Sequence, residues 1–582
     1  MRQPLFKRSF GPALLAKDET ERQEVQGMEN TYVIGLDYGT LSARAVLVCC
    51  QDGRVEATAV KPYPHQVMDR VLPDGSTKLG ANWALEHPED YILAMTETVR
   101  SVMEGREDLK NAVVGIGIDF TSCTILPVDE AGTPLCCLKE YEGRPHAYAK
   151  LWKHHAAQPQ ADRINLVLEE RGELQGIRYG GKISSELLLP KVLQMVEEDP
   201  EIYRRADQIL EAGDWLTQTL TGEGRRSGNM AGYKAMWLPE SGYPDKEFLR
   251  QLHPELENIG ETKLRGEMAL MGQPAGFLTR EWAEKLGLPE GITVAPAVID
   301  SHSGLPGSGV SRKDQMMMVV GTSSVLLALS EKPFARDGVV SGIKGGIVPG
   351  YYALESGLAA VGDMLGWFVD QAAPESCAKA AEELGMNLHS YLTKKAGELR
   401  PGQSGLVALD WWNGNKTPFV DGRLSGVLTG CTLGTKPEEI YRALIEATAF
   451  GTRRIVDLYE EAGAQIGEII ASGGIAEKNP LFLQIYADVL GKKIRVSATE
   501  QTAAVGSAIY ASVAAGAARG GYDTLGEAVE RMSRIHEKAY IPDEENGKIY
   551  HKLYGLYKEL SGMFDPGRNS VMARLLELKS GI

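Results

Sequence analysis

Two segments of the chain, 282 residues apart (321 − 39), share one pattern of apolar and polar positions. Each has an apolar run, a Gly-Thr-x-Ser tetrad and a second apolar run, over residues 32–48 and 316–329. Two short apolar strands joined by such a turn favour a β-hairpin. Glycine lets the backbone approach a ligand, and the neighbouring N–H and hydroxyl groups can donate to phosphate oxygens. One such turn could be an ordinary tight turn, but one in each half indicates a duplicated scaffold that binds a nucleotide from both sides.

Apolar spacing predicts alternating strands and helices in both halves. In the first half we expect strands at 32–37, 45–50, 55–60, 112–120 and 292–299, and helices at 88–103, 185–198 and 214–220. In the second half we expect strands at 316–320, 325–329, 347–354 and 468–471, and helices at 437–463, 480–490 and 503–517. This order predicts an α/β fold with two mixed sheets flanked by helices. The boundary should lie near 300–315, with the glycine-rich stretch 304–309 as a flexible crossing.

Composition narrows the class of protein. The chain has 582 residues, 43% of them hydrophobic and 24% charged, which is typical of a globular protein with two or more cores. The net charge of −16 argues against nucleic acid or an anionic membrane as a partner. No apolar run reaches the roughly 18 to 20 residues that span a bilayer. Seven cysteines without a C-x-x-C pair predict neither a zinc site nor a disulfide framework, and favour the cytoplasm.

The amino-terminal residues 1–30 form a separate segment. They begin basic and become acidic, and their short apolar piece is interrupted by Pro12. A signal peptide needs a longer uninterrupted apolar core. We therefore expect a disordered extension, with a targeting role as the alternative.

Several motifs together resemble those of the FGGY carbohydrate kinases, which are members of the actin/hexokinase-like ATPase superfamily. They are the stretch 35–44, the D-x-H stretch that starts at Asp300, the Gly-Thr-Ser at 321–323 and the Gly473-Gly474 loop. The resemblance covers residues 32 to about 578. It implies two actin/hexokinase-like (RNase H-like) domains with an interdomain active-site cleft. Residues 31–303 would bind the sugar and residues 304–582 the nucleotide.

Four further segments resemble the branch of this family that phosphorylates L-ribulose: 151–156, 180–186, 231–234 and 409–414. This resemblance implies ATP-dependent phosphorylation of a ketopentose, with L-ribulose and MgATP as small-molecule partners, and it is compatible with a homodimer. A kinase of another ketose or polyol, such as D-ribulose, xylulose or ribitol, is the alternative within the family. Actin-like and Hsp70-like ATPases, which phosphorylate no sugar, are the alternative outside it.

Phosphoryl transfer to a hydroxyl needs a carboxylate base, a metal ion and donors around the phosphates. Asp300 ends an apolar strand and is the candidate base, although an aspartate there could instead cap the next helix. Asp37 directly precedes the first Gly-Thr turn and by resemblance would hold Mg²⁺, with a turn-forming role as the alternative.

The nucleotide-binding candidates lie in the two hairpin turns and in the double-glycine loop. The first turn could reach the γ-phosphate, the second the β- and γ-phosphates, and the loop the adenine or ribose. Arg44 could instead be a surface strand residue. No G-x-x-x-x-G-K-[ST] is present, which excludes a P-loop. The candidates are Thr40, Ser42, Arg44, Gly321, Thr322, Gly473, Gly474 and Asn479.

By resemblance the sugar would be bound by Ser122, Lys234, Asp300 and Glu355. A hydroxyl or backbone group, a cation and two carboxylates can bracket a polyol. Lys234 and Glu355 could instead be solvated surface residues. The family more usually has alanine or glycine in place of Ser122, and a glutamine in place of Leu358. These two departures leave the fine sugar preference open.

Overall fold

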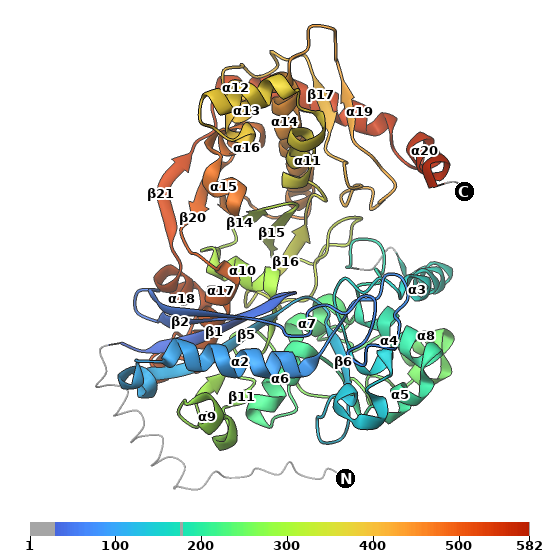
Figure 1. Ribbon diagram of the computed structural model, residues 1–582, viewed down its shortest axis with the longest axis vertical. Helices are drawn as coiled ribbons and strands as arrows, with labels where there is room; N and C mark the ends of the chain where they lie inside the picture. Colours follow the sequence, from blue (N-terminus) through green and yellow to red (C-terminus); the bar gives the residue numbers. More distant parts are fainter. Residues whose placement is uncertain (1–29, 175–177, 581–582) are drawn as a thin grey trace, which may run out of the picture.

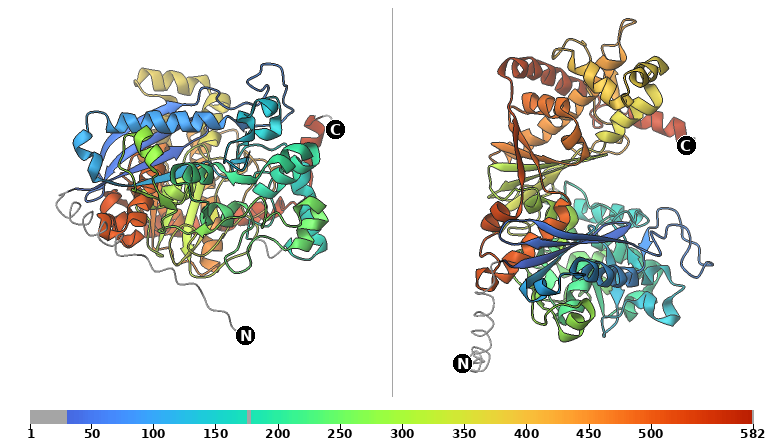
Figure 2. Two further views of the ribbon diagram at one scale, coloured as in Figure 1. Left: turned by 90° about the horizontal axis from the view of Figure 1, so that it is seen from below. Right: turned by 60° about the vertical axis from the view of Figure 1, so that its left-hand side comes forward.

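The computed structural model of the protein describes residues 30–174 and 178–580, so the predicted extension over 1–30 lies outside the described residues except for Asn30. The chain forms two lobes that are stacked along the long axis (Figure 1). The lower lobe in this view contains the first half of the chain, and the upper lobe contains most of the second half. Figure 2 shows the same two lobes from two further directions.

The lower lobe is built on a seven-stranded sheet with the order β11-β12-β5-β1-β2-β3, in which β13 also pairs with β5. The upper lobe is built on a six-stranded sheet with the order β16-β15-β14-β19-β20-β21. The strands of the first sheet are β1 (Tyr32–Tyr38), β2 (Ser42–Cys49), β3 (Val55–Pro62), β5 (Val113–Phe120), β11 (Gly276–Phe277), β12 (Thr293–Val294) and β13 (Val298–Ile299). Those of the second are β14 (Gln315–Val320), β15 (Ser324–Ser330), β16 (Tyr352–Ser356), β19 (Glu468–Ser472), β20 (Lys493–Ser497) and β21 (Ile535–Tyr540).

The two sheets repeat one topology. β1 pairs antiparallel with β2 and parallel with β5, and β14 pairs in the same way with β15 and β19. The next neighbours correspond as well, because β12 is parallel to β5 as β20 is to β19, and each sheet ends in an antiparallel edge strand. This correspondence confirms the duplicated design that the two Gly-Thr hairpins indicated.

Helices cover both sheets. Those of the first half are α2 (Pro88–Met103), α3 (Gln158–Glu170), α4 (Leu188–Glu198), α5 (Pro200–Arg205), α6 (Ala212–Thr221), α7 (Gly228–Lys234), α8 (Lys246–Leu252), α9 (Arg280–Leu286) and α10 (Asp300–Gly307). Those of the second half are α11 (Gly362–Trp367), α12 (Glu375–Glu383), α13 (Leu388–Gly397), α14 (Pro437–Glu461), α15 (Gly474–Lys478), α16 (Pro480–Leu490), α17 (Thr502–Ala515), α18 (Leu525–Met532), α19 (Glu544–Met563) and α20 (Val571–Ser580).

Most predicted elements are confirmed, and α2 has the predicted bounds. Three differ. The strand expected at 292–299 is two short strands, β12 and β13, and the strand expected at 347–354 starts only at Tyr352. The flexible crossing expected at 304–309 is wrong, because residues 300–307 form the helix α10, which is buried from His302 to Gly307. The predicted boundary between residues 303 and 304 falls inside this helix.

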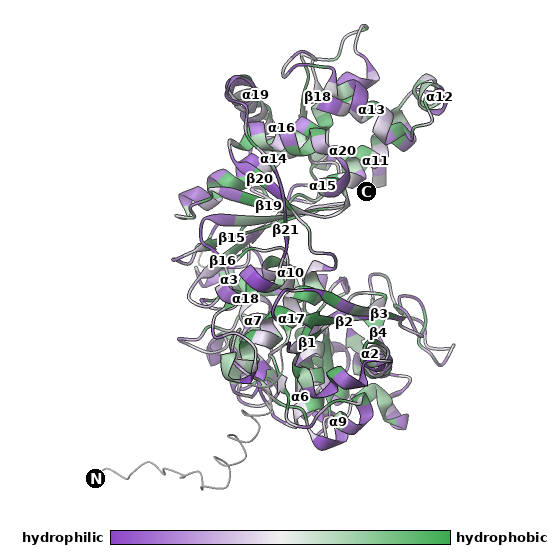
Figure 3. Cartoon of the chain, turned by 90° about the vertical axis from the view of Figure 1, so that its left-hand side faces the viewer, coloured by the Kyte–Doolittle hydropathy of each residue, from purple (hydrophilic) through white to green (hydrophobic). Residues whose placement is uncertain are grey.

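α10 and α17 pack against each other between the two sheets. Glycines at their contact make this approach possible, since a Cβ at Gly307 would lie 1.8 Å from the Thr502 carbonyl oxygen, and one at Gly506 1.8 Å from that of Ser303. α17 also packs on β1 and β5 of the lower lobe, although it belongs to the second half of the sequence. Figure 3 shows α17 and the strands beside it mostly in the hydrophobic colour.

A third core lies beside the first sheet in the lower lobe. It surrounds a four-stranded sheet of β4 (Leu85–Glu86), β7 (Ala149–Lys150), β6 (Ile125–Val128) and β8 (Gln208–Glu211), and includes residues of α3, α4, α5 and α8. The sequence patterns did not predict this sheet. Among the described residues no helix is both long and apolar enough to span a membrane.

Candidate active site

Three aspartates come together at the ends of neighbouring strands. β1, β5 and β13 run parallel, with β5 between the other two, so their carboxyl ends meet at one edge of the sheet. The register pairs Asp37 with Asp119, and Asp119 with Val298, two residues before Asp300. In open α/β sheets this edge is where ligands bind. The arrangement therefore places Asp37 and Asp300, both predicted site residues, beside a third carboxyl that was not predicted.

Asp300 is the first residue of α10 and remains partly exposed. Burial raises the pKa of its carboxyl to about 7, opposed by a hydrogen bond from the Ser301 N–H and by Lys234, and assisted by Asp37 and Glu355. The Ser301 N–H lies 2.6 Å from its Oδ1. A general base works best when its pKa lies near the working pH. Asp300 thus has the chemistry expected of a base near neutral pH.

Asp119 is fully buried, and its Oδ2 accepts a hydrogen bond from the Ser507 hydroxyl of α17. Its Oδ1 has no hydrogen-bond partner among the described residues. Burial, and then the neighbouring Asp37, raise the pKa of Asp119 well above its usual value. On the other side, Asp37 pairs with Arg44 of β2 at 2.8 Å.

A cation and a carboxylate from different lobes are near enough to Asp300 to influence its pKa. Lys234 ends α7, and Glu355 lies in β16 of the upper sheet. Burial would lower the pKa of Lys234, but the carboxylates of Glu355, Glu186 and Asp300 raise it. Burial would likewise raise the pKa of Glu355, but Lys234 and His302 lower it to about 2. Both groups are therefore charged at neutral pH. Lys234 can donate hydrogen bonds to hydroxyl oxygens, and Glu355 can accept hydrogen bonds from hydroxyl groups.

The loop that carries Ser122 is held in an unusual conformation. Ser122 itself is half-buried, and the next residue, Cys123, has a φ of 51° although it is not glycine. Its carbonyl accepts a hydrogen bond of 2.6 Å from the Lys191 ammonium, which also donates to the Leu151 carbonyl at 2.9 Å. A non-glycine residue with positive φ persists only where its surroundings enforce it. Lys191 supplies that constraint.

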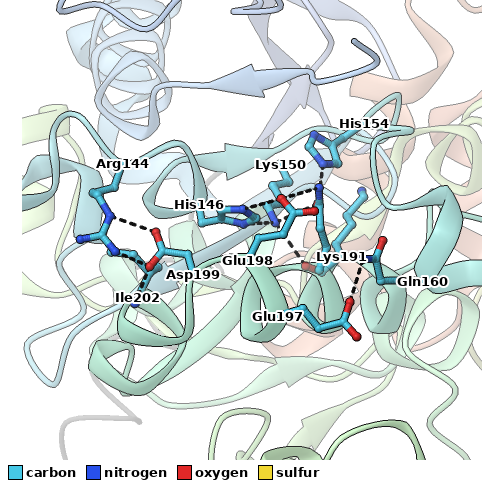
Figure 4. A network of polar contacts seen from close by, with 11 residues as sticks. Arg144, His146, Lys150, His154, Gln160, Lys191, Glu197, Glu198, Asp199 and Ile202 are labelled. Carbon is cyan, nitrogen blue, oxygen red and sulfur yellow. Dashed lines mark hydrogen bonds and ion pairs between the residues drawn. The ribbon is translucent and has the colours of Figure 1, made fainter. Parts of the chain in front are cut away.

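Lys191 belongs to a buried polar network between α4 and the segment 144–154 (Figure 4). Lys150 contacts His146 Nδ1 at 2.8 Å and Gln194 Oε1 at 3.3 Å, and His154 Nε2 contacts the same Gln194 oxygen at 2.9 Å. Burial lowers the pKa of Lys150 to about 7. The network fixes α4, and with it Lys191, against the wall of the lower lobe.

A cavity of about 710 Å³ opens in the upper lobe beside the second Gly-Thr turn. Four predicted nucleotide-binding residues line it: Gly321, Thr322, Gly474 and Asn479. Its other lining residues come from α11, α14, α15 and the region of α13, and they include Asp363, Asn387, His389, Thr393 and Tyr441. Pockets for small molecules and cofactors commonly have volumes of about 300–1,000 Å³. The cavity is therefore large enough for a nucleotide.

The two glycines of the double-glycine loop have different roles. Gly473 has a φ of 96°, and a Cβ on it would lie 2.4 Å from the Val320 carbonyl oxygen, so the fold itself requires glycine there. A Cβ on Gly474 would meet no described atom within 4 Å, so this position is open towards the cavity. Asn479 lines the cavity and also caps α16 by accepting the Phe482 N–H at 3.1 Å.

A backbone hydrogen bond closes each hairpin turn. It runs from Gly39 N–H to the Ser42 carbonyl at 3.1 Å in the first turn and from Gly321 N–H to the Ser323 carbonyl at 2.9 Å in the second. Thr40 accepts a hydrogen bond of 3.1 Å from the Trp152 indole. A Cβ on Gly321 would meet only the Ser323 carbonyl oxygen, at 3.9 Å. The second turn therefore has space for a phosphate group.

Two family descriptions together match most of the chain. The N-terminal domain of the FGGY family of carbohydrate kinases matches residues 32–307, and the C-terminal domain of the same family matches residues 316–515. The chain belongs to the FGGY family of carbohydrate kinases.

Relatives of this FGGY kinase include the ribulokinase of Halalkalibacterium halodurans, 48% identical over 95% of this chain and 98% of that protein. The ribulokinase of Bacillus licheniformis is 49% identical over 93% of this chain and 98% of that protein. Among solved structures, xylulose kinase from Rhodospirillum rubrum superposes with a TM-score of 0.76 at 24% identity, over 92% of this chain and 99% of that one. The last likeness shows that the two-lobed fold is that of sugar kinases.

In this FGGY kinase, eight of the thirteen predicted site residues fall into two groups. Asp37, Lys234, Asp300 and Glu355 meet where the two lobes join, and Gly321, Thr322, Gly474 and Asn479 line the cavity of the upper lobe. Thr40, Ser42 and Arg44 lie on the β1–β2 hairpin beside Asp37, outside that cavity. Gly473 does not line the cavity and directly precedes α15.

Sequence reasoning missed several residues of this FGGY kinase site. Asp119 could have been found, because it ends a buried strand as Asp37 and Asp300 do. Lys191 and the residues of the α13 region carry no local signal, because only the tertiary fold brings them to the site.

Proposed function

We propose that the protein is an ATP-dependent ribulokinase that phosphorylates the terminal O5 hydroxyl of L-ribulose. One observation supports the kinase chemistry above all: Asp300 has a pKa of about 7 and lies near the positively charged Lys234 and the negatively charged Glu355. The similarity to curated ribulokinases, 46–49% identical over most of the chain, supports L-ribulose as the sugar.

The residues account for the reaction as follows. The ionised Asp300 accepts the proton of the sugar hydroxyl while the oxygen of that hydroxyl forms a bond to the γ-phosphorus of ATP. The bond from that phosphorus to the bridging oxygen breaks, and ADP leaves. Lys234 and Glu355 orient the sugar through its other hydroxyls, since an ammonium donates hydrogen bonds to hydroxyl oxygens and a carboxylate accepts hydrogen bonds from hydroxyl groups. The hairpin turns at Thr40 and Thr322 donate to the phosphates.

We further propose that Mg²⁺ accompanies ATP and is held at Asp37. Mg²⁺ prefers one or two carboxylates together with waters and substrate phosphates. Asp37 fits, because it is partly exposed at the strand edge, next to the phosphate turn. The described residues contain no group of three or more His, Cys, Asp or Glu side chains that could hold a metal alone. When bound, the ion would neutralise phosphate charge.

We place the enzyme in the cytoplasm. All seven cysteines lie in the described part of the chain, and none of them forms a disulfide there. Unpaired cysteines are typical of a reducing compartment.

A sugar panel with coupled detection of ADP tests the proposal. We expect L-ribulose to give the highest kcat/KM, D-ribulose and ribitol to be slower, and glycerol to be poor. One wrong stereocentre leaves a buried polar group unpaired, which lowers kcat/KM by roughly 10- to 100-fold. A preference for D-xylulose or glycerol would contradict the substrate but not the kinase chemistry. Absence of sugar-stimulated ADP release would contradict both.

A further inference from the structure

The side chain of Asn229, in α7, has an orientation that its neighbours determine completely. It is fully buried. Its Oδ1 accepts the Ile299 N–H at 3.0 Å, and because a backbone N–H can only donate, this atom must be the oxygen. Its Nδ2 then donates to the Gly346 carbonyl at 2.7 Å and to His302 Nδ1 at 2.9 Å. Both hydrogens of the amide are used.

This orientation determines the tautomer of His302. Because Asn229 Nδ2 can only donate, His302 Nδ1 must accept, and the ring proton lies on Nε2. His302 Nε2 is 3.2 Å from Glu355 Oε2, so the ring donates to that carboxylate. The ring is fully buried and packs edge-on against Tyr233, with the centroids 4.4 Å apart. Burial lowers the pKa of His302, which agrees with a neutral imidazole.

The two side chains link the base to the other lobe. Ile299, whose N–H is held by Asn229, directly precedes Asp300. Glu355, which His302 holds, comes from β16 of the upper sheet. Asn229 lies in the same short helix as Lys234, the cation of the site. One uninterrupted chain of hydrogen bonds therefore runs from the backbone beside Asp300 to the carboxylate that faces the sugar.

We propose that Asn229 and His302 are positioning residues that fix Asp300 and Glu355 relative to each other around the acceptor sugar. The proposal rests on the proposed function, because it takes Asp300 as the base and Glu355 as a sugar ligand. His302 occupies one oxygen of Glu355 and leaves the other for a sugar hydroxyl. Asn229 acts on both residues, through the Ile299 backbone and through the imidazole.

The first test compares two variants at position 302. His302→Leu removes the donor to Glu355, whereas His302→Gln keeps an amide N–H near the position of Nε2. We expect the leucine variant to raise the KM for sugar by roughly 10- to 100-fold, since a buried partner is left unpaired, while the KM for ATP stays within about twofold. The glutamine variant should recover most of the lost sugar affinity.

The second test is a double-mutant cycle with Asn229→Leu. This variant removes the acceptor for the Ile299 N–H, so we expect a lower kcat as well as a higher KM for sugar. If both residues act through one chain, the double variant should be about as impaired as Asn229→Leu alone, because the effects of residues in one network do not add. Tyr554→Phe is the matched control, since it removes a partly buried hydrogen bond of 2.6 Å from the Tyr554 hydroxyl, in the outer helix α19, to Asp457 of α14. It should affect thermal stability only.

The outcomes separate this proposal from the proposed substrate. Kinetics are measured with L-ribulose and with every other pentulose that the wild type phosphorylates. A wild type that is inactive on L-ribulose but active on another sugar overturns the substrate, and the cycle is then measured on that other sugar. Unchanged sugar KM in His302→Leu, equal effects on sugar and ATP, or additive effects in the cycle overturn the positioning role.

Discussion

Asp300 must be ionised to accept a proton, and its surroundings oppose ionisation. Its pKa of about 7 means that the free enzyme holds the inactive, protonated form below neutral pH. We therefore expect kcat/KM for sugar to rise tenfold per pH unit below about pH 7 and to level off above it. A pH–rate profile at saturating MgATP checks this. A profile that is already flat between pH 5 and 7 would contradict the assignment.

Replacing the carboxylate separates catalysis from stability. Asp300→Asn should lower kcat by at least roughly 10²- to 10⁴-fold, because it removes a group that acts only in the transition state, and ATP affinity should change little. The pKa of Asp300 in the folded protein lies above the ordinary aspartate value of 3.8, so the folded state binds the proton more tightly. The stability that this proton gives is lost as the pH rises through about 7. At pH 8 the variant should melt no lower than the wild type. Activity above a tenth of wild type would refute the role of Asp300.

At the scale of elements, the double-glycine turn before α15 offers a matched pair of variants. Gly474→Val should fold, because a Cβ there meets open space, and it should raise the KM for ATP far more than that for sugar. Gly473→Val should instead lower the melting temperature, since its Cβ would press on the Val320 carbonyl and its φ is 96°. Thermal melts and ATP titrations distinguish the two. A Gly474→Val variant that loses sugar affinity but not ATP affinity would show that the cavity is not the nucleotide site.

The contact between α4 and the loop at Ser122 gives a second test. Lys191→Met keeps the length of the side chain but leaves the Cys123 carbonyl without its Lys191 donor. The Leu151 carbonyl loses one of two donors and keeps the His154 N–H at 3.0 Å. We expect the variant to lose about 1–3 kcal/mol of folding stability and to have a higher KM for sugar than the wild type has, with the KM for ATP unchanged. The control is Lys285→Met, which changes an exposed lysine that pairs with Glu281 at 2.7 Å and stacks on Trp282, and it should change neither constant. Equal effects of the two variants would rule out a role for Lys191 in shaping the loop.

The same elements show what a sequence can reveal. Strands such as β1 and β14 were predictable because a buried strand in a mixed sheet is an unbroken apolar run ended by a glycine turn. α10 was mistaken for a flexible crossing because Gly304, Pro306 and Gly307 are poor helix formers. It is helical because tertiary packing against α17 overrides propensity. The third core was missed because its strands have only two to four residues.

Within the site, the predictable residues are those that a local motif marks. Asp37 and Gly321 lie in hairpin turns whose pattern is visible over a dozen residues. Asn229 and Lys191 have no such pattern, because their partners are 70 and 68 residues away in sequence. A buried polar side chain is recognised only when the groups that it satisfies are known.

At the scale of the whole molecule, no single lobe contains a complete site. The lower lobe supplies Asp37, Lys234 and Asp300, while the upper lobe supplies Glu355 and the cavity lined by Gly321 and Gly474. The lobes are joined through α10 and α17, whose contact at Gly307 and Gly506 brings their backbones together. Any change in the angle between the lobes therefore changes the distance between the cavity at Gly321, where we propose that ATP binds, and Asp300.

We expect this geometry to couple lobe closure to substrate binding. The phosphate turns at Thr40 and Thr322 lie on different lobes, so one triphosphate can contact both only when they approach each other. Closure would also exclude water from the γ-phosphate, and ATP hydrolysis without sugar should therefore be slow.

Small-angle scattering should show a smaller radius of gyration with sugar and a non-hydrolysable ATP analogue together than without ligands. His302→Leu, which breaks the contact between α10 and Glu355 of the upper lobe, should reduce the change. An identical radius of gyration with and without both ligands would contradict closure, and rapid hydrolysis of ATP without sugar would contradict the exclusion of water.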